Sequence, residues 1–346
     1  MHAFIVHSGL TLQACRAVIR HLDLAEDEVV VIAGRGFGTR LMDEFREVWD
    51  LDLMAYPKVD IFKATLTIWS QVRRFDDHFK QLLGGREYHF YTVHLMGYFY
   101  QLLASHPSCT GFSFIEDGLL SYRSRANVRR SIGVPQLGWG RFRRYLLQDR
   151  LALDWPYDVR AHAAYGFSDH SYADWKLNRV VLEPRWPRID LSGSLPKGSV
   201  VCILAPAYSS SKVRWSPEQY FAVMSDLSHL LRGLRVPIYL KYHPDQKPDE
   251  RMLIRTIFRN TIGSVEEIGD DVQVESLCVD GDVTVLSCGS SVGLYAALWG
   301  RRVYSYMSLF NRVAPAVVAD WEKVRSSMTV VMRELNVDEL RADLMR

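Results

Sequence analysis

Two adjacent carboxylates follow an apolar run in the first half of the chain. Glu116 and Asp117 end this run, and Gly118 comes next, where a glycine permits a tight turn. Neighbouring carboxylates repel each other when both are ionised, so one of such a pair can accept a proton near neutral pH. Glu116 and Asp117 are therefore both candidate general bases. An Asp-Gly turn without a chemical role is the alternative interpretation.

A cation and an imidazole follow another apolar run in the second half of the chain. Lys241 closes this run, His243 comes two residues later, and Pro244 follows the histidine directly. The proline restricts His243 to the extended region of backbone conformation. A protonated imidazole can neutralise the charge of a phosphate group, so the pattern indicates a site for a phosphorylated ligand. A surface histidine in a turn after a strand is the alternative.

The third pattern consists of small and hydroxylated residues. Gly289, Ser290 and Ser291 separate an apolar run from a helical pattern. Free N–H groups and hydroxyls at the start of a helix bind anions without a metal, and ordinary serine capping is compatible with such binding. The acidic pairs at 76–77 and 270–271 lack the Asp-x-Asp spacing. We therefore predict no catalytic metal and no other cofactor.

These patterns stand at strand ends in a regular alternation of strands and helices. The expected strands of the first half are residues 3–7, 28–33, 88–93 and 111–115, with helices at 10–22 and 95–104. Those of the second half are 200–205, 237–241, 283–287 and 302–306, with helices at 217–232, 250–260 and 292–299. This order is typical of parallel α/β sheets, whose ligands bind at the carboxyl ends of the strands. We predict two Rossmann-like domains with parallel sheets facing a central cleft, the architecture called GT-B.

The domain boundaries follow from changes in composition. The segment 184–198 is rich in proline and has little periodicity, so we interpret it as the linker. It separates a first domain, 1–183, from a second domain, 199–314. The remaining segment, 315–346, has a helical pattern and could pack back onto the first domain.

Composition and charge exclude several classes of protein. A net charge of +2 on 346 residues argues against nucleic acid as the main partner. The basic stretch 123–144 indicates either a solvated helix or a patch for anionic lipid or glycan. Five cysteines without a CxxC pair predict reduced thiols. No apolar run approaches the ~20 residues that cross a bilayer, so we expect a cytoplasmic protein, at most peripheral at the inner face of the membrane. The sequence neither requires nor excludes a homodimer.

Taken in order, the motifs resemble those of a known group of enzymes. Glu116-Asp117-Gly118, His243-Pro244 and Ser290-Ser291 are similar to the acidic-acidic-Gly, His-Pro and Ser-Ser motifs of bacterial GT-B sialyltransferases. The opening Thr11-Leu12-Gln13 looks like the start of the lipooligosaccharide sialyltransferases of glycosyltransferase family 52, although their proline before Leu12 is missing. The resemblance extends over most of the chain as an ordered set of short motifs.

The resemblance implies an inverting, metal-independent transfer of sialic acid from CMP-sialic acid to a glycan hydroxyl. Such a protein would serve lipopolysaccharide or capsule synthesis, with an oligosaccharide or glycolipid acceptor on the first domain and the nucleotide sugar on the second. Glu116 or Asp117 would be the base, and His243 would stabilise or protonate the departing CMP. The residues implied to bind the donor are Lys241, Pro244, Glu275, Gly289, Ser290 and Ser291. His7 and His94 each follow an expected strand and could contact the acceptor, although a packed histidine explains either position.

Three other functions fit the same residues. The donor could carry another CMP-activated sugar, such as Kdo, pseudaminic acid or legionaminic acid. A UDP-sugar epimerase of the same fold would bind a uridine nucleotide and need no acceptor. A catalytically inactive glycan-binding protein would bind the donor without turnover, a reading that the three intact motifs disfavour.

Overall fold

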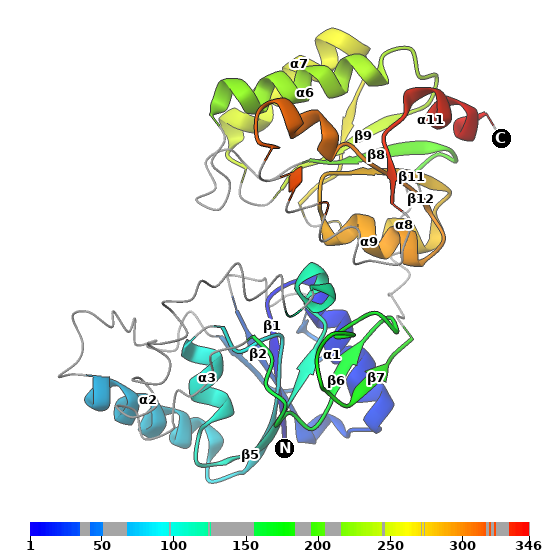
Figure 1. Ribbon diagram of the computed structural model, residues 1–346. Coiled ribbons are helices and arrows are strands. Elements are labelled where there is room, and N and C mark those ends of the chain that lie inside the picture. The colour runs from blue at the N-terminus through cyan, green and yellow to red at the C-terminus, as the bar shows by residue number, and fades with distance from the viewer. Residues whose placement is uncertain are drawn as a thin grey trace. The chain divides into compact units, whose positions relative to one another are not determined.

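The computed structural model describes most of the chain (Figure 1). The described residues are 1–34, 42–50, 68–96, 98–123, 125, 156–183, 195–204, 216–243, 246–270, 272, 274–315, 318–319, 322 and 332–345. Contacts divide the chain into two units, Met1–Arg185 and Trp186–Arg346. Each unit contains a parallel sheet with helices, which confirms the predicted α/β class. No helix in the described part of the chain has both the length and the apolar character needed to cross a membrane.

The first domain is built on a parallel sheet. Its strands are β1 His2–Val6, β2 Val29–Ala33, β3 Val48–Asp50, β4 Tyr88–Thr92, β5 Cys109–Ile115, β6 Ala164–Gly166 and β7 Arg179–Val181. Over the described residues the strand order is β3-β2-β1-β4-β5-β6-β7, and the pairs are parallel. β2 is apolar and buried at every position, as expected for a strand that is covered on both faces.

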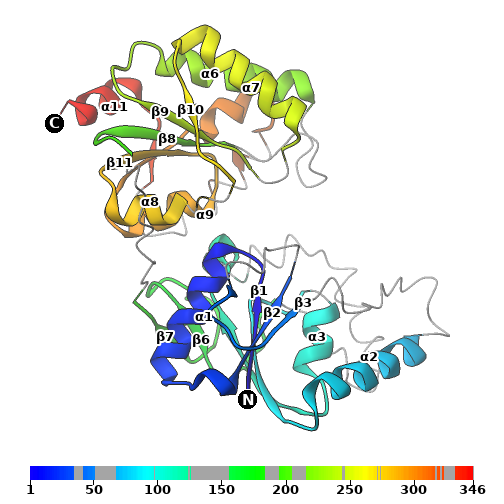
Figure 2. The same cartoon turned by 180° about the vertical axis from the view of Figure 1, so that it is seen from behind.

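Helices cover both faces of this sheet. α1, Gly9–Leu22, lies on one face, and α2, Ile68–Leu83, and α3, Tyr98–Ala104, lie on the other (Figures 1 and 2). Alternate residues of a strand point to opposite faces, so one set of strand residues packs with α2 and α3 in a single core. This core includes Ala3, Ile5, Val30, Ile32, Phe75, Phe79, Phe90, Leu102 and Phe114.

The second domain repeats this layered arrangement. Its strands are β8 Ser199–Ile203, β9 Ile238–Lys241, β10 Glu266–Glu267, β11 Val283–Ser287, β12 Arg302–Ser305 and β13 Arg333–Glu334. They are parallel and, among the described residues, lie in the order β10-β9-β8-β11-β12-β13. α6, Pro217–Leu231, and α7, Pro248–Ile262, cover one face, whereas α8, Val274–Asp280, and α9, Ser291–Leu298, cover the other (Figures 1 and 2).

The described part of the C-terminal segment belongs to the second domain. β13 pairs with β12, and α11, Val337–Leu344, follows it. The Tyr304 hydroxyl donates to Asp343 at 2.6 Å, and Arg341 donates to the carbonyl of Arg232 at 3.4 Å. These contacts connect residues 332–345 to the second sheet, whereas the sequence had suggested that the segment could pack on the first domain.

Candidate functional site

The carboxyl edge of the first sheet has a topological switch point between β1 and β4. The chain continues from β1 to β2 and β3 on one side, and from β4 to β5 on the other. Loops leave such a point in opposite directions and open a crevice where ligands bind in α/β proteins. His7 directly follows β1, His94 follows β4 by two residues, and Asp117 follows β5 by two residues. Three ionisable side chains therefore lie on three adjacent strand ends.

Glu116, the first member of the acidic pair, is fully buried. Its Oε2 atom accepts hydrogen bonds from the backbone N–H of Phe167 at 2.6 Å and from the Ser171 hydroxyl at 2.7 Å. Its Oε1 atom accepts one from the Tyr122 hydroxyl at 2.7 Å. Burial raises the pKa of Tyr122, and the negative charge of Glu116 raises it further, so this hydroxyl remains a donor. Glu116 is thus used to hold the structure together, and the geometry does not favour it as the base.

A close backbone approach makes the Glu116 arrangement possible. Gly166 ends β6, and a Cβ atom at this position would lie 2.4 Å from the Cβ of Ser171 and 3.0 Å from Oε2 of Glu116. Such distances would force the chain to move, so Gly166 is required for Ser171 and Phe167 to reach the carboxylate. The sequence analysis missed all three of these residues, which lie 50 or more positions away along the chain.

Asp117, the second member of the pair, is in a different situation. Its Oδ1 atom lies 3.0 Å from Nε2 of His7, and its side chain is 16% exposed against 4% for His7. An ionised carboxylate only accepts hydrogen bonds, so Nε2 of His7 carries the proton. Oδ2 of Asp117 has no hydrogen-bond partner within the described residues. Asp117 is therefore oriented through Oδ1, and Oδ2 belongs to a side chain that is 16% exposed and can accept a proton.

The backbone around this pair is fixed at two points. The hydroxyl of Thr11 accepts hydrogen bonds from the N–H groups of His7 and Ser8, each at 3.0 Å. Ser8 in turn caps α1 by accepting from the N–H of Thr11, which forms a capping box. On the other side, the N–H of Asp117 donates to the Ser121 hydroxyl at 3.2 Å. Thr11 was noted in the sequence only for the resemblance of its motif, and its hydroxyl fixes the backbone of His7.

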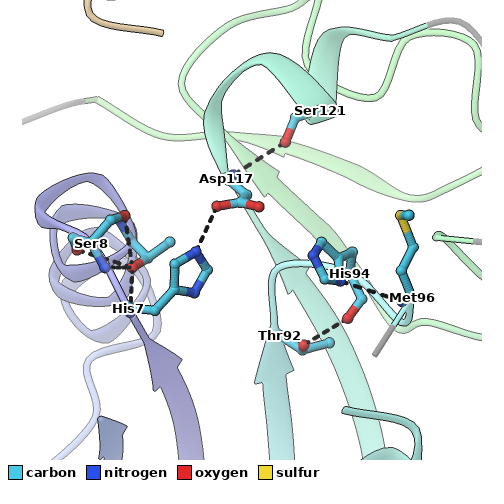
Figure 3. Close-up of polar contacts among 8 residues, drawn as sticks. His7, Ser8, Thr92, His94, Met96, Asp117 and Ser121 are labelled. Atoms are coloured by element: carbon cyan, nitrogen blue, oxygen red, sulfur yellow. Dashed lines mark hydrogen bonds and ion pairs between the residues drawn. The ribbon is translucent and has the colours of Figure 1, made fainter. Parts of the chain in front are cut away.

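His94 lies on the side of the Asp117 carboxylate opposite His7 (Figure 3). Its Nδ1 atom accepts a hydrogen bond from the N–H of Met96 at 3.3 Å, so Nε2 carries the hydrogen when the ring is neutral. The ring packs edge-on against Tyr100 at 5.0 Å and is almost buried. His7 thus contacts Asp117 directly, and His94 follows β4, which lies in the sheet between the strands that precede His7 and Asp117.

The carboxyl edge of the second sheet carries the His-Pro motif. Lys241 ends β9, and its ammonium donates to the carbonyls of Gly269 and Val272 at 2.5 and 2.9 Å. Lys241 thus joins the end of β9 to the segment before α8, and its implied role in binding the donor stays a prediction. His243 follows two residues later and is partly exposed. Pro244 lies outside the described residues.

The N–H and carbonyl groups of His243 are both bonded to Gln246. The Oε1 atom of Gln246 accepts from the His243 N–H at 2.7 Å, and the Gln246 N–H donates to the His243 carbonyl at 2.9 Å. Gln246 is buried and was not selected from the sequence. A glutamine three residues after the motif histidine was the available signal.

The Ser-Ser motif forms the start of α9. Gly289 has a φ of 70°, a left-handed conformation that favours glycine. Ser290 is the N-cap, and its hydroxyl accepts from the N–H of Val292 at 3.3 Å. Ser291 is the first residue of the helix and is partly exposed. The N–H groups and hydroxyls at the start of α9 can bind an anion.

His243 and Ser290 follow β9 and β11, the two strands that flank β8 in the sheet. Neighbouring strands are about 4.8 Å apart, so these two strand ends are separated by about 10 Å. Glu275 lies in the first turn of α8, where burial raises its pKa and the charge of Lys241 opposes the shift. The second domain therefore gathers an imidazole, a helix start and a carboxyl group on one edge.

Comparison with known proteins identifies the fold. No model of a protein family matches the chain, and no curated protein matches its sequence. The glycotransferase of kitacinnamycin matches with a TM-score of 0.53 and 13% identity, over 99% of this chain and 89% of that one. The calicheamicin glycosyltransferase CalG4 matches with a TM-score of 0.52 and 13% identity, over 100% and 88%. The fold is GT-B.

A third similar structure is the S. aureus MnaA-UDP co-structure. It has a TM-score of 0.52 and 12% identity and covers 100% of this chain and 87% of that one. At this identity the GT-B similarity shows the fold and does not transfer a substrate. Within the described residues, no group of three or more His, Cys, Asp and Glu side chains is arranged to hold a metal ion.

Proposed function

We propose that this protein is an inverting sialyltransferase that moves sialic acid from CMP-sialic acid to a hydroxyl group of a glycan acceptor. The observation that carries the proposal is the division of labour in the acidic pair. Glu116 accepts three hydrogen bonds inside the domain, whereas Asp117 keeps one accessible oxygen while His7 holds the other. The order of the acidic, His-Pro and Ser-Ser motifs supports the choice of donor.

The proposed reaction begins at Asp117. Its Oδ2 atom takes the proton of the acceptor hydroxyl as that oxygen attacks the anomeric carbon. The N–H of His7 keeps the carboxylate in one orientation through Oδ1, so proton transfer needs no rotation of the side chain. A new carbon–oxygen bond forms as the bond between the anomeric carbon and the phosphate oxygen of CMP breaks. Attack opposite the leaving group inverts the configuration.

The leaving phosphate takes the electron pair of the broken bond. His243 stabilises this charge or donates a proton to it, and the start of α9 at Ser290 and Ser291 binds the phosphate oxygens. Sialic acid also has its own carboxylate, so we expect the transfer rate to be unchanged by a chelator.

A UDP-sugar epimerase is the second candidate. The S. aureus MnaA-UDP structure is as similar to this chain as CalG4 is, with a TM-score of 0.52 for each, so the fold is compatible with a uridine nucleotide as well as with a cytidine nucleotide. The two candidates differ in their nucleotide and in whether an acceptor is needed.

The test is a panel of donors incubated with the full-length protein. CMP-sialic acid, CMP-Kdo and UDP-N-acetylglucosamine are each supplied with and without a mixture of lactose-terminated and sialylated oligosaccharides. CMP release from CMP-sialic acid that rises with acceptor, and falls in Asp117→Asn, supports the proposal. CMP release from CMP-Kdo alone would change the donor. Acceptor-independent conversion of the UDP-sugar, without binding of any cytidine nucleotide, would overturn the proposal in favour of the epimerase.

A further inference from the structure

We infer that Gln246 and Tyr220 are positioning residues for His243, and that they act from beneath the donor-binding edge of the second domain. The inference rests on the proposed function of His243 and names the residues on which that function depends. Neither residue belongs to the motifs that suggested the activity. Both are buried, with exposed fractions of 4% for Gln246 and 0% for Tyr220, so neither can bind a substrate directly.

Gln246 fixes the backbone of His243 from both sides. Its side-chain oxygen accepts the His243 N–H at 2.7 Å, and its own N–H donates to the His243 carbonyl at 2.9 Å. These two bonds join His243 to a buried residue three positions later in the chain. The imidazole is attached to this backbone, so fixing the peptide groups on both sides of the Cα atom fixes the direction of the Cα–Cβ bond from which the ring extends. A displacement of about 1 Å at a reacting group can cost about 100-fold in rate.

Tyr220 holds the other end of the Gln246 side chain. The Nε2 atom of Gln246 donates to the Tyr220 hydroxyl at 2.7 Å. The orientation of the amide is settled by chemistry, because the backbone N–H of His243 can bond only to the amide oxygen. Nε2 must therefore point to Tyr220. Without the hydroxyl, the buried Nε2 would lose this partner, and the amide could rotate away from His243.

Tyr220 also lies close to the Ser-Ser motif. It belongs to the first turn of α6, the helix that follows β8. In the sheet, β8 lies between β9, which precedes His243, and β11, which precedes Ser290. Burial raises the pKa of Tyr220, and the nearby Cys288 and Glu250 raise it further, so the hydroxyl stays protonated. Cys288 directly precedes Gly289 and Ser290. Tyr220 thus contacts Gln246 directly and lies near Cys288, the residue that precedes the Ser-Ser motif by two positions.

The Gln246→Ala variant removes the acceptor for the His243 N–H. We expect kcat for acceptor-dependent CMP release to fall about 10- to 100-fold, with a smaller change in KM for the donor. Tyr220→Phe keeps the ring and removes the hydroxyl, and we expect a smaller loss of kcat. Gln246→Glu keeps an acceptor for the His243 N–H and lets the tyrosine hydroxyl donate to the carboxylate. It should recover much of the rate that the alanine variant loses.

A matched control comes from the same domain. The side chain of Gln219 accepts from the N–H of Ser216 at 3.1 Å, and the N–H of Gln219 donates to the Ser216 hydroxyl. Gln219→Ala removes a similar reciprocal contact and leaves the hydrogen bonds between His243 and Gln246 in place. This variant should lose some stability and keep kcat within about twofold.

The decisive experiment is a double-mutant cycle between Gln246 and His243. If Gln246 acts through the imidazole, Gln246→Ala lowers kcat in the wild-type protein and has little further effect in a His243→Ala background. An equal loss of kcat in both backgrounds would overturn the inference, because the glutamine would then act elsewhere.

Amide hydrogen exchange separates a failure of this inference from a failure of the proposed function. We expect the His243 amide to exchange at least 10-fold faster in Gln246→Ala and in Tyr220→Phe than in Gln219→Ala, under conditions in which all three variants are folded. Unchanged exchange at His243 would overturn the positioning role of Gln246 and Tyr220, whether or not the protein turns over a donor. Faster exchange in a protein that binds no cytidine nucleotide would support the positioning role and contradict the sialyltransferase proposal.

Discussion

The centres of the two sheets have the same strand order but present different chemistry at their carboxyl edges. In the first domain the order is β3-β2-β1-β4-β5-β6-β7, and in the second it is β10-β9-β8-β11-β12-β13, so the two orders correspond apart from the additional β7. In both, the first and the fourth strands lie side by side, so both sheets have a switch point at the corresponding place. The first edge carries Asp117 between two imidazoles. The second carries His243 and the start of α9, with the hydroxyls of its two serines.

From this difference we infer that the strand order determines where a ligand can bind. The side chains at the strand ends determine which chemical step the ligand can undergo. A carboxylate with one accessible oxygen suits the acceptance of a proton. N–H groups, hydroxyls and an imidazole suit the binding of a phosphate. We therefore expect substitutions at the first edge to change kcat and those at the second to change donor affinity as well. Each prediction below tests this contrast.

The largest effect is expected for Asp117→Asn. The amide keeps the shape of the side chain and can still accept from His7, but it cannot take a proton, so kcat should fall about 10²- to 10⁴-fold. The KM for the donor should change little. Initial rates of CMP release at saturating acceptor measure both quantities.

Asp158 supplies the control for this substitution. Its side chain pairs with Arg160 and is 15% exposed. This exposure is close to the 16% of the Asp117 side chain. Asp158→Asn should keep the wild-type rate within about twofold. If Asp117→Asn kept a comparable rate, the first edge would not be the place of proton transfer.

Glu116→Gln should show the opposite pattern. The carboxylate accepts three hydrogen bonds in the interior, and an amide places an NH₂ group against at least one of these donors. We expect a loss of about 1–3 kcal/mol in the free energy of unfolding, with kcat of the folded protein within a few-fold of wild type. Urea unfolding and rates at a temperature where the variant is folded measure the two effects. A variant that is stable but inactive would contradict this structural role and would make Glu116 a candidate base again.

Much of the fold could be predicted from the sequence because long apolar runs and capped helices are local signals. The strands near β1, β2, β4, β5, β8, β9, β11 and β12 were all expected. α2 was not, although it has the charged and apolar mixture of a surface helix. The short strands β3, β6, β7, β10 and β13 were also missed. They have two or three residues each, and they exist because a neighbouring strand supplies their hydrogen bonds.

The candidate site was predictable only as far as residue types go. Adjacent acids mark the end of β5, but nothing local says that Glu116 points to Ser171 and Asp117 to His7. Those contacts span 55 and 110 positions in the chain. Lys241 shows the same limit, since its ammonium bonds to carbonyls 28 and 31 residues away. Long-range pairing decides which of several suitable side chains is left available for a substrate.

A smaller effect is expected in acid, where protonation of an imidazole should destabilise the first domain more than the second. Burial lowers the pKa of His89 to about 4, and the nearby His162, His2 and N-terminus lower it further. The rings of His89 and His162 are 5.0 Å apart. Between pH 6.5 and about 4 the unfolded chain binds a proton that the folded domain does not, so stability falls as the pH falls through this window. Partial exposure of the ring limits the loss to about 1–2 kcal/mol.

The pH dependence is measured by urea unfolding at several pH values between 7 and 4. His89→Gln can keep a hydrogen bond to the hydroxyl of Ser113, which lies 2.9 Å from Nε2, and it removes the titration, so the curve of stability against pH should flatten. His229→Gln, at an exposed position of α6 in the second domain, should leave the curve unchanged. A wild-type curve that is flat across this window would show that the imidazole cluster is not a source of acid sensitivity.

The smallest effect is expected at Ser290, where capping and phosphate binding can be separated. The hydroxyl caps α9, and replacing an N-cap serine by alanine costs about 1 kcal/mol of stability, whereas glycine costs only a few tenths. Ser290→Gly should therefore be nearly as stable as the wild type. If the hydroxyl also binds the donor phosphate, this variant should still raise the KM for the donor several-fold with little change in kcat. A normal KM in Ser290→Gly, together with lower stability in Ser290→Ala, would reduce Ser290 to a helix cap and leave the anion chemistry of the second edge to His243 and the backbone.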